Sequence, residues 1–168
     1  IQKVLDEKER FGRSDLFSGR RLLIEFVSAN PTGPLHVGHG RNAVVGDTLA
    51  RIYEAAGFQV EREYYFNDAG VQMTLLGESL RARYLEQCGR EVSLPDGGYQ
   101  GDYLSDIAKQ LRAQVGDSKS GEEKPSFFGD YAADAIMKLI RNDLERLDIG
   151  FDRYFSETSL HRGGAVEA

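Results

Sequence analysis

A turn that contains two prolines and a glycine, Pro31-Thr32-Gly33-Pro34, separates an apolar run from a helical pattern near the start of the sequence. Residues 22–27, LLIEFV, are apolar except for Glu25, as in a buried parallel strand. Proline fixes φ and lacks an amide donor, so neither a helix nor a strand ladder continues through the turn. The sequence therefore predicts a strand, a turn and a helix over residues 21–57.

The helix after this turn has an apolar stripe. From Gly38 onward, residues of this stripe recur every three or four positions, and Gly57 is typical of the residue just past a helix end. The spacing predicts that one face of the helix packs on the sheet. The stripe consists of Val44, Val45, Thr48, Leu49, Ile52, Tyr53 and Ala56.

Two histidines, His36 and His39, lie at the expected helix start, flanked by Gly38 and Gly40. Free backbone N–H groups and the positive end of the helix dipole make such a position an anion site. Residues three apart share a helix face, so both imidazoles can reach one ligand. A lone histidine is more often a packed or surface residue, but this pair between glycines favours a binding site. Arg41 could reach a phosphate or could equally be a solvated helix residue.

Polar residues surround the end of the first strand. A carboxylate such as Glu25 in an apolar strand is costly unless paired, so either a nearby arginine satisfies it or it receives a guanidinium ligand. Ser28 and Asn30 lie where α/β sheets bind ligands. Asn30 could instead form an Asx-type turn before Pro31. The residues by themselves leave both pairs of alternatives open.

The remaining sequence predicts two more strands and three helices. The strands cover residues 58–66 and 151–155, and the helices cover 71–88, 102–115 and 127–147. Asp68 is placed to cap the first of these helices, and Asp47 and Arg51 are spaced to pair on the earlier one. The fold class is therefore α/β: a Rossmann-like parallel sheet over residues 21–168, with a helical insertion at about 71–149 and a leader at 1–20.

Each helix of the insertion has a predicted buried stripe. The stripes are Leu75, Leu76, Leu80 and Tyr84, then Leu104, Ile107, Ala108, Leu111 and Val115, then Phe128, Tyr131, Ala132, Ala135, Ile136, Leu139, Ile140 and Leu147. In the leader, Val4 and Leu5 are candidates to dock on the body. Residues 116–126 are charged and small, as in a disordered loop, and 157–168 form a tail.

The composition restricts the possible partners. The formal net charge is −6, so the main surface for a nucleic acid is not expected in this chain. A single cysteine, Cys88, excludes an internal disulfide and suits a reducing cytoplasm. No apolar run reaches membrane-spanning length. Because the chain begins with Ile1 and not with methionine, we interpret it as a piece of a longer protein.

Several motifs together resemble one enzyme family. His36-Val37-Gly38-His39 matches the His-x-Gly-His motif of class I aminoacyl-tRNA synthetases, and residues 25–41, EFVSANPTGPLHVGHGR, resemble a bacterial arginyl-tRNA synthetase. Further matches are YYFNDAG at 64–70, YQGDY at 99–103 and FDRYFSE at 151–157. Together they extend over most of the chain. Lys119-Ser120 does not match the second signature loop of the class.

The resemblance implies a fold, an activity and a set of site residues. The chain would be the first half of a class I catalytic domain, inactive by itself, from an enzyme that joins L-arginine to ATP and then to tRNA(Arg) in the cytoplasm. ATP would carry Mg²⁺ on its phosphates and on water, without protein metal ligands. In such enzymes Glu25, Ser28, Ala29, Asn30 and His39 would contact arginine. His36, Gly38, His39 and Gly40 would contact ATP, with His36 and His39 catalytic.

Two other functions are compatible with parts of this pattern. Another nucleotidyltransferase with a His-x-Gly-His site for ATP would share the helix start but would give Glu25 no guanidinium partner. A non-catalytic paralogue that binds arginine and ATP would keep the site without the reaction.

Overall fold

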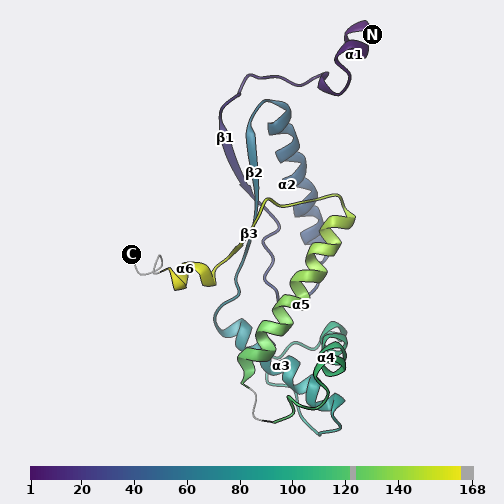
Figure 1. The fold of residues 1–168 in the computed structure, drawn as a ribbon, viewed down its shortest axis with the longest axis vertical. Helices are drawn as coiled ribbons and strands as arrows, with labels where there is room; N and C mark the ends of the chain where they lie inside the picture. Colours follow the sequence, from purple (N-terminus) through teal and green to yellow (C-terminus); the bar gives the residue numbers. More distant parts are fainter. Residues whose placement is uncertain (122–123, 164–168) are drawn as a thin grey trace.

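The computed structural model describes residues 1–121 and 124–163. Its centre is a parallel sheet of three strands in the order β1 (Arg21–Glu25), β2 (Gln59–Phe66) and β3 (Arg153–Ser156) (Figure 1). The predicted Rossmann-like parallel sheet is confirmed. Because all three strands run in one direction, their carboxyl ends meet at one edge, where open α/β sheets bind ligands.

Helix α2 (Val37–Ala55) lies along the sheet (Figure 1) and contacts it through small residues. Its buried positions are Ala43, Gly46, Asp47 and Ala50. A Cβ on Gly46 would lie 2.2 Å from the Phe26 ring, so the ring occupies the space that a larger side chain would need. The helix and the sheet therefore approach closely along the small residues.

The prediction that the apolar stripe of α2 packs on the sheet is wrong. Its large members are between 40% and 58% exposed, and Thr48 is exposed as well; these large members are Val44, Val45, Leu49, Ile52 and Tyr53. The periodicity correctly grouped these residues on one side of the helix. That side faces outward because the opposite side, with its small residues, is the one that fits against Phe26 and β2.

The helical insertion lies beyond the carboxyl ends of the strands. It consists of α3 (Val71–Gln87), α4 (Asp102–Val115) and α5 (Pro125–Arg146), and α5 rises from α3 and α4 toward the lower end of α2 (Figure 1). Most members of the predicted stripes are buried: Leu76, Leu80, Tyr84, Leu104, Ile107, Ala108, Leu111, Phe128, Ala132, Ile136 and Ile140. Leu139 and Leu147 are exposed, against the prediction. Leu147 is the residue past the last turn of α5, where the helix no longer presents a packed face.

Helices α3 and α5 cross at two glycines, Gly77 and Gly129. A Cβ on Gly77 would lie 2.2 Å from the carbonyl oxygen of Pro125 and 2.9 Å from the amide nitrogen of Gly129. A Cβ on Gly129 would lie 2.9 Å from the carbonyl oxygen of Met73. The two helix backbones are therefore in direct contact at this crossing.

Of the residues before β1, Ser14 and Phe17 contact the body: their N–H groups donate to the carbonyl oxygens of Ala55 and Ala56 at 2.8 and 3.2 Å. α1 (Gln2–Glu7) and the 3₁₀ turn η1 (Lys8–Arg10) are exposed, and so are Val4 and Leu5, which do not dock. The Phe17 and Phe58 rings stack with centroids 4.6 Å apart. After β3 the chain forms the short helix α6 (Thr158–Arg162). Parts of the predicted loop and tail, residues 122–123 and 164–168, lie outside the described residues.

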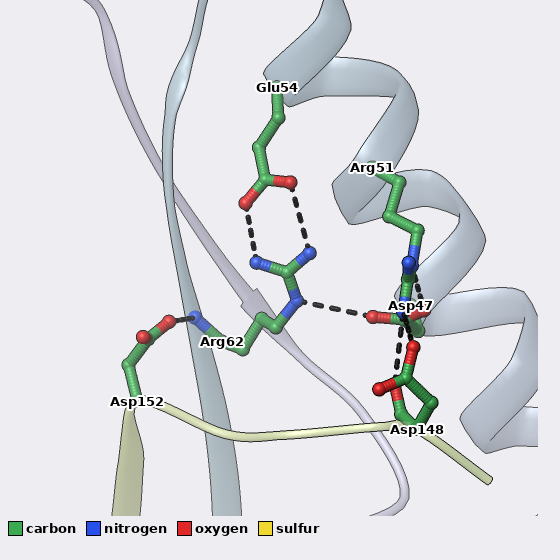
Figure 2. A network of polar contacts seen from close by, with 6 residues as sticks. All are labelled: Asp47, Arg51, Glu54, Arg62, Asp148 and Asp152. Carbon is green, nitrogen blue, oxygen red and sulfur yellow. Dashed lines mark hydrogen bonds and ion pairs between the residues drawn. The ribbon is translucent and has the colours of Figure 1, made fainter. Parts of the chain in front are cut away.

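A network of charged side chains joins α2 to β2 (Figure 2). The Asp47 carboxylate, 8% exposed, accepts from Arg51 at 2.5 Å and from Arg62 at 3.3 Å. Arg62 also donates to both carboxylate oxygens of Glu54, at 2.5 and 3.2 Å. The predicted pair of Asp47 and Arg51 is confirmed, but its carboxylate is shared with a second guanidinium and is buried between helix and sheet.

The same network extends to the connection between α5 and β3. The Arg51 guanidinium donates to the carbonyl oxygen of Asp148 at 2.9 Å and to its carboxylate at 3.3 Å. The Asp152 carboxylate accepts from the backbone N–H of Arg62 at 2.8 Å. Figure 2 shows the Asp148 contact on the connection itself and the Asp152 contact where the connection reaches β3. The network therefore attaches the chain that leads into β3 to the middle of α2 and β2.

Asp68 does not cap α3, contrary to the prediction. The residue before α3 is Gly70, and no side chain makes a cap bond there. The Asp68 carboxylate instead accepts from the Ser156 hydroxyl at 2.5 Å and from the backbone N–H of Thr158 at 2.9 Å. Because Thr158 begins α6, Asp68 connects the ends of β2 and β3.

Candidate functional site

Glu25 ends β1 and lies beside Glu63 of β2 in the parallel register. Arg62 points to α2, so strand alternation places Glu63 and its register partner Glu25 on the other face of the sheet. Leu23 on that face is half exposed, so none of the described elements covers β1 there. Glu25 and the start of α2 therefore lie at the same edge of the sheet, with Glu25 on the face opposite to the helix.

The two neighbouring carboxylates differ in their partners. Glu63 accepts an ion pair from Arg153 of β3, with 3.4 Å between Oε2 and Nε. Within residues 1–121 and 124–163, the Glu25 carboxylate makes no hydrogen bond or ion pair. The sequence left two alternatives for a glutamate in this strand, and each applies to a different residue. Glu63 is paired with a nearby arginine, whereas Glu25 is exposed with its carboxylate available.

The histidines form a reciprocal cap at the start of α2. Nδ1 of His36 accepts from the Gly38 N–H at 3.1 Å, and Nδ1 of His39 accepts from the His36 N–H at 3.3 Å. The two rings stack with centroids 3.7 Å apart. A neutral imidazole that accepts at Nδ1 carries its proton on Nε2. The backbone therefore fixes the tautomer, and each ring presents an Nε2–H donor.

Burial, and to a smaller extent repulsion from His36 when both rings are protonated, lowers the pKa of His39 below its usual value of 6.5. The neutral ring is the form that the cap requires, because a proton on Nδ1 would remove the acceptor for the His36 N–H. The structure therefore keeps His39 uncharged near neutral pH.

We expect the free energy of unfolding to fall as the solution is acidified below pH 6.5. The unfolded chain takes up a proton on His39 at higher pH than the folded chain, since the folded pKa is the lower one. The contribution is complete above the unfolded pKa and is lost as the pH falls through the folded pKa. Urea unfolding at about pH 7.5 and pH 5.5 measures it. In His39→Asn, which keeps an acceptor but does not titrate, the difference between the two pH values should shrink.

The two glycines of the helix start have different surroundings. A Cβ on Gly38 would lie 2.9 Å from Cε1 of His36, so this glycine leaves room for the capping imidazole. A Cβ on Gly40 would meet nothing within 4 Å.

A groove of about 360 Å³ lies between β1 and the first half of α2, lined by Glu25, Phe26, Gly38, Arg41, Asn42 and Val45 among others. The end of β1 and the start of α2 therefore line the same groove.

The segment 28–30 is attached to β2 and α3 by hydrogen bonds. The Ala29 N–H donates to the Tyr64 hydroxyl at 3.1 Å, and this hydroxyl donates to the Ala29 carbonyl at 2.8 Å. Asn30 accepts from the Asn67 N–H at 3.1 Å and donates to Gln72 at 3.1 Å. The side chain of Asn30 thus connects the turn to the residues after β2, and one amide hydrogen and one lone pair have no partner in the described part of the chain.

Two tyrosines that support the turn were not identified as site residues from the sequence. Tyr64 is fully buried under Ala29, and the Tyr103 hydroxyl donates to the Thr32 carbonyl at 2.6 Å. Burial raises the pKa of Tyr103 to about 12, so the hydroxyl stays protonated and able to donate. Both residues lie inside the motifs at 64–70 and 99–103, and these motifs were the sequence signal that could have identified them.

The described residues contain no group of three or more His, Cys, Asp or Glu side chains suited to a metal ion.

Comparisons with known proteins identify the family. Residues 1–152 match the family model of tRNA synthetases class I (R), catalytic domain. The chain is 49% identical to the arginine–tRNA ligase of Desulfotalea psychrophila over 168 residues, covering 100% of this chain and 30% of that protein. It is 49% identical over 168 residues to that of Gloeobacter violaceus, covering 100% of this chain and 28% of that protein.

Solved structures agree with these relatives. A putative arginyl-tRNA synthetase from Campylobacter jejuni superposes with a TM-score of 0.86 at 39% identity, over 95% of this chain and 36% of that one. None of the helices in the described part of the chain is long and apolar enough to cross a membrane. The chain spans about 30% of the length of its curated relatives. With nine-tenths of its length inside the family model, the chain belongs to the class I arginyl-tRNA synthetases as a segment of their catalytic domain.

Proposed function

We propose that this segment holds the guanidinium of L-arginine and the phosphates of ATP in an arginyl-tRNA synthetase. The observation that carries the proposal is the carboxylate of Glu25, which has no partner among the described residues, at the carboxyl edge of the sheet and beside a Glu63 that already has its guanidinium in Arg153. The whole protein would form arginyl-adenylate and then transfer arginine to tRNA(Arg). The isolated chain would bind both small substrates without turning them over, because much of the protein lies elsewhere.

Glu25 can distinguish arginine from other cationic amino acids. A carboxylate and a guanidinium form two parallel charge-assisted hydrogen bonds, which an ammonium group cannot reproduce. Since Glu25 lies on the open face of the sheet, arginine would extend over the edge, with its carboxylate toward α2. Ser28, Ala29 and Asn30 would line its path between the two ends.

The start of α2 would bind ATP. The Nε2–H groups of His36 and His39 are donors for phosphate oxygens, and the open position of Gly40 admits the nucleotide, while Gly38 allows the His36 cap. The arginine carboxylate attacks the α-phosphate, pyrophosphate leaves, and the imidazoles stabilise the developing charge without a covalent enzyme intermediate. Mg²⁺ would be held by phosphates and water. The net charge of −6 supports a main tRNA surface in another part of the protein, and the single cysteine supports a cytoplasmic location.

Glu25→Gln is expected to weaken arginine binding by about 10- to 100-fold, the value of charge-assisted hydrogen bonds. ATP affinity should change less than about twofold on the same scale, because Glu25 does not face the phosphates. Isothermal calorimetry of the chain with arginine, with ATP and with citrulline, the neutral analogue of arginine, measures both effects.

The matched control is Glu61→Gln, which removes the same charge from β2 at the position opposite Leu23 and should leave arginine affinity unchanged. Equal losses for arginine and ATP in Glu25→Gln would reject the guanidinium role. ATP binding without preference for arginine over citrulline would favour a different nucleotidyltransferase. Turnover by the isolated chain in pyrophosphate exchange would reject its proposed dependence on the rest of the enzyme.

A further inference from the structure

The residues that leave β1 have a strained backbone. Val27 has φ 65° and Ser28 has φ 44°, in the left-handed region that side chains with a Cβ rarely occupy. The Ser28 N–H donates to the Phe26 carbonyl at 2.9 Å, which closes a three-residue γ-turn around Val27. The form of this turn with positive φ is rare, and a β-branched residue in it is a clear outlier. Such conformations persist only where surrounding contacts impose them, commonly at functional sites.

Asn42 of α2 contacts the strained residue Val27 directly. Its Oδ1 accepts from the Val27 N–H at 2.7 Å. The next residues are held from β2: the Tyr65 N–H donates to the Ser28 hydroxyl at 3.2 Å, and Tyr64 bonds both backbone groups of Ala29. Within the described chain, the amide oxygen of Asn42 thus makes the hydrogen bond that attaches this turn to α2, beside the packing of the Phe26 ring on Gly46.

We propose that Asn42 is a positioning residue: it holds the Val27–Ser28 turn in its strained form and so fixes the arginine side of the site against the helix that carries His36 and His39. The inference rests on the proposed function. Asn42 lies one helical turn after His39, and the turn that it holds lies between Glu25 and Asn30. One side chain therefore sets the spacing between the two substrate-binding parts, without touching either substrate.

The side-chain type fits this task. An amide oxygen accepts the Val27 N–H without adding charge to the groove that Asn42 lines together with Gly38 and Arg41. Aspartate would accept the same hydrogen bond but would place a negative charge near the expected phosphates. Asn42→Asp should therefore keep the turn and arginine binding while weakening ATP binding, whereas Asn42→Ala should release the turn.

The first test needs no ligand. Hydrogen exchange of the Val27 amide, followed by NMR in this chain, should become at least about tenfold faster in Asn42→Ala, because its acceptor is lost. Protection should return in Asn42→Asp. Asn142→Ala, at an exposed position of α5, is the matched control and should leave exchange unchanged. Unchanged protection of Val27 in Asn42→Ala would overturn the proposal.

The second test separates positioning from a general loss of stability. Asn42→Ala should weaken arginine binding about five- to tenfold in calorimetry, the value of one hydrogen bond. Glycine adopts positive φ without strain, so Val27→Gly should make arginine affinity insensitive to Asn42→Ala. A double variant that loses as much affinity as the single one would overturn the proposal. Absence of arginine binding in the unsubstituted chain would reject the proposed function, while the exchange experiment still decides the role of Asn42.

Discussion

Replacing His39 by alanine is expected to slow arginyl-adenylate formation by about 100- to 1,000-fold in a full-length synthetase that carries this segment. The expectation follows from the Nε2–H donor that the helix cap leaves available at the proposed phosphate site, since loss of one preorganised donor costs about 2.7–4 kcal/mol of barrier. Arginine-dependent exchange of pyrophosphate into ATP measures the step before tRNA transfer. An unchanged rate would remove His39 from the reaction.

Alanine at this position also removes half of the reciprocal cap, so a second variant is needed. In His39→Asn, the side-chain oxygen can replace Nδ1 as acceptor for the His36 N–H, but no group replaces Nε2. If the donor is what matters, His39→Asn should be nearly as slow as His39→Ala while unfolding at a higher urea concentration. His161→Ala, at an exposed histidine of α6, controls for loss of an imidazole and should keep the full rate.

Gly77→Ala is expected to lower the free energy of unfolding by about 2–3 kcal/mol. In a helix interior this substitution usually stabilises by about 0.5–1 kcal/mol. Here the new methyl group would lie 2.2 Å from the Pro125 carbonyl and 2.9 Å from the Gly129 amide nitrogen. Both are backbone atoms, so α3 and α5 would have to separate, and overpacking of this kind costs about 1–3 kcal/mol.

Urea unfolding followed by circular dichroism measures this effect. Gly40→Ala is the matched control, because it is also a glycine inside a helix but has nothing within 4 Å of its Cβ position. It should leave stability unchanged or raise it by up to about 1 kcal/mol. A Gly77→Ala protein as stable as Gly40→Ala would mean that the two helices cross at a larger distance than described.

The elements themselves could be predicted because their signals are local. The predicted helix 102–115 has the bounds Asp102–Val115, and the predicted strands 58–66 and 151–155 became Gln59–Phe66 and Arg153–Ser156. Periodicity and turn residues act over a few positions, and the Pro31–Pro34 turn forces a change of element wherever it occurs. The position of His36 and His39 at a helix start was predicted from such local signals, whereas their reciprocal cap was not.

The buried face of α2 could not be predicted in this way. Periodicity shows which residues share a face, but it does not show which face lies against the sheet. Hydrophobicity favoured the side of Val45 and Leu49, whereas close approach to the Phe26 ring required the side of Gly46 and Ala50. The space left by the sheet therefore decided the orientation, and this space is a property of the packed structure.

The sequence by itself determined the order of strands and helices, the turn after β1, the histidines at a helix start and the resemblance to arginyl-tRNA synthetases. Only the tertiary structure decided which carboxylate has no partner among the described residues, since Arg153 reaches Glu63 and not Glu25. It also decided that Asp68 binds the start of α6 and that Asn42 holds the turn at Val27. These pairs join residues far apart in the chain, and the distance between their atoms depends on how whole elements pack, which local spacing does not encode.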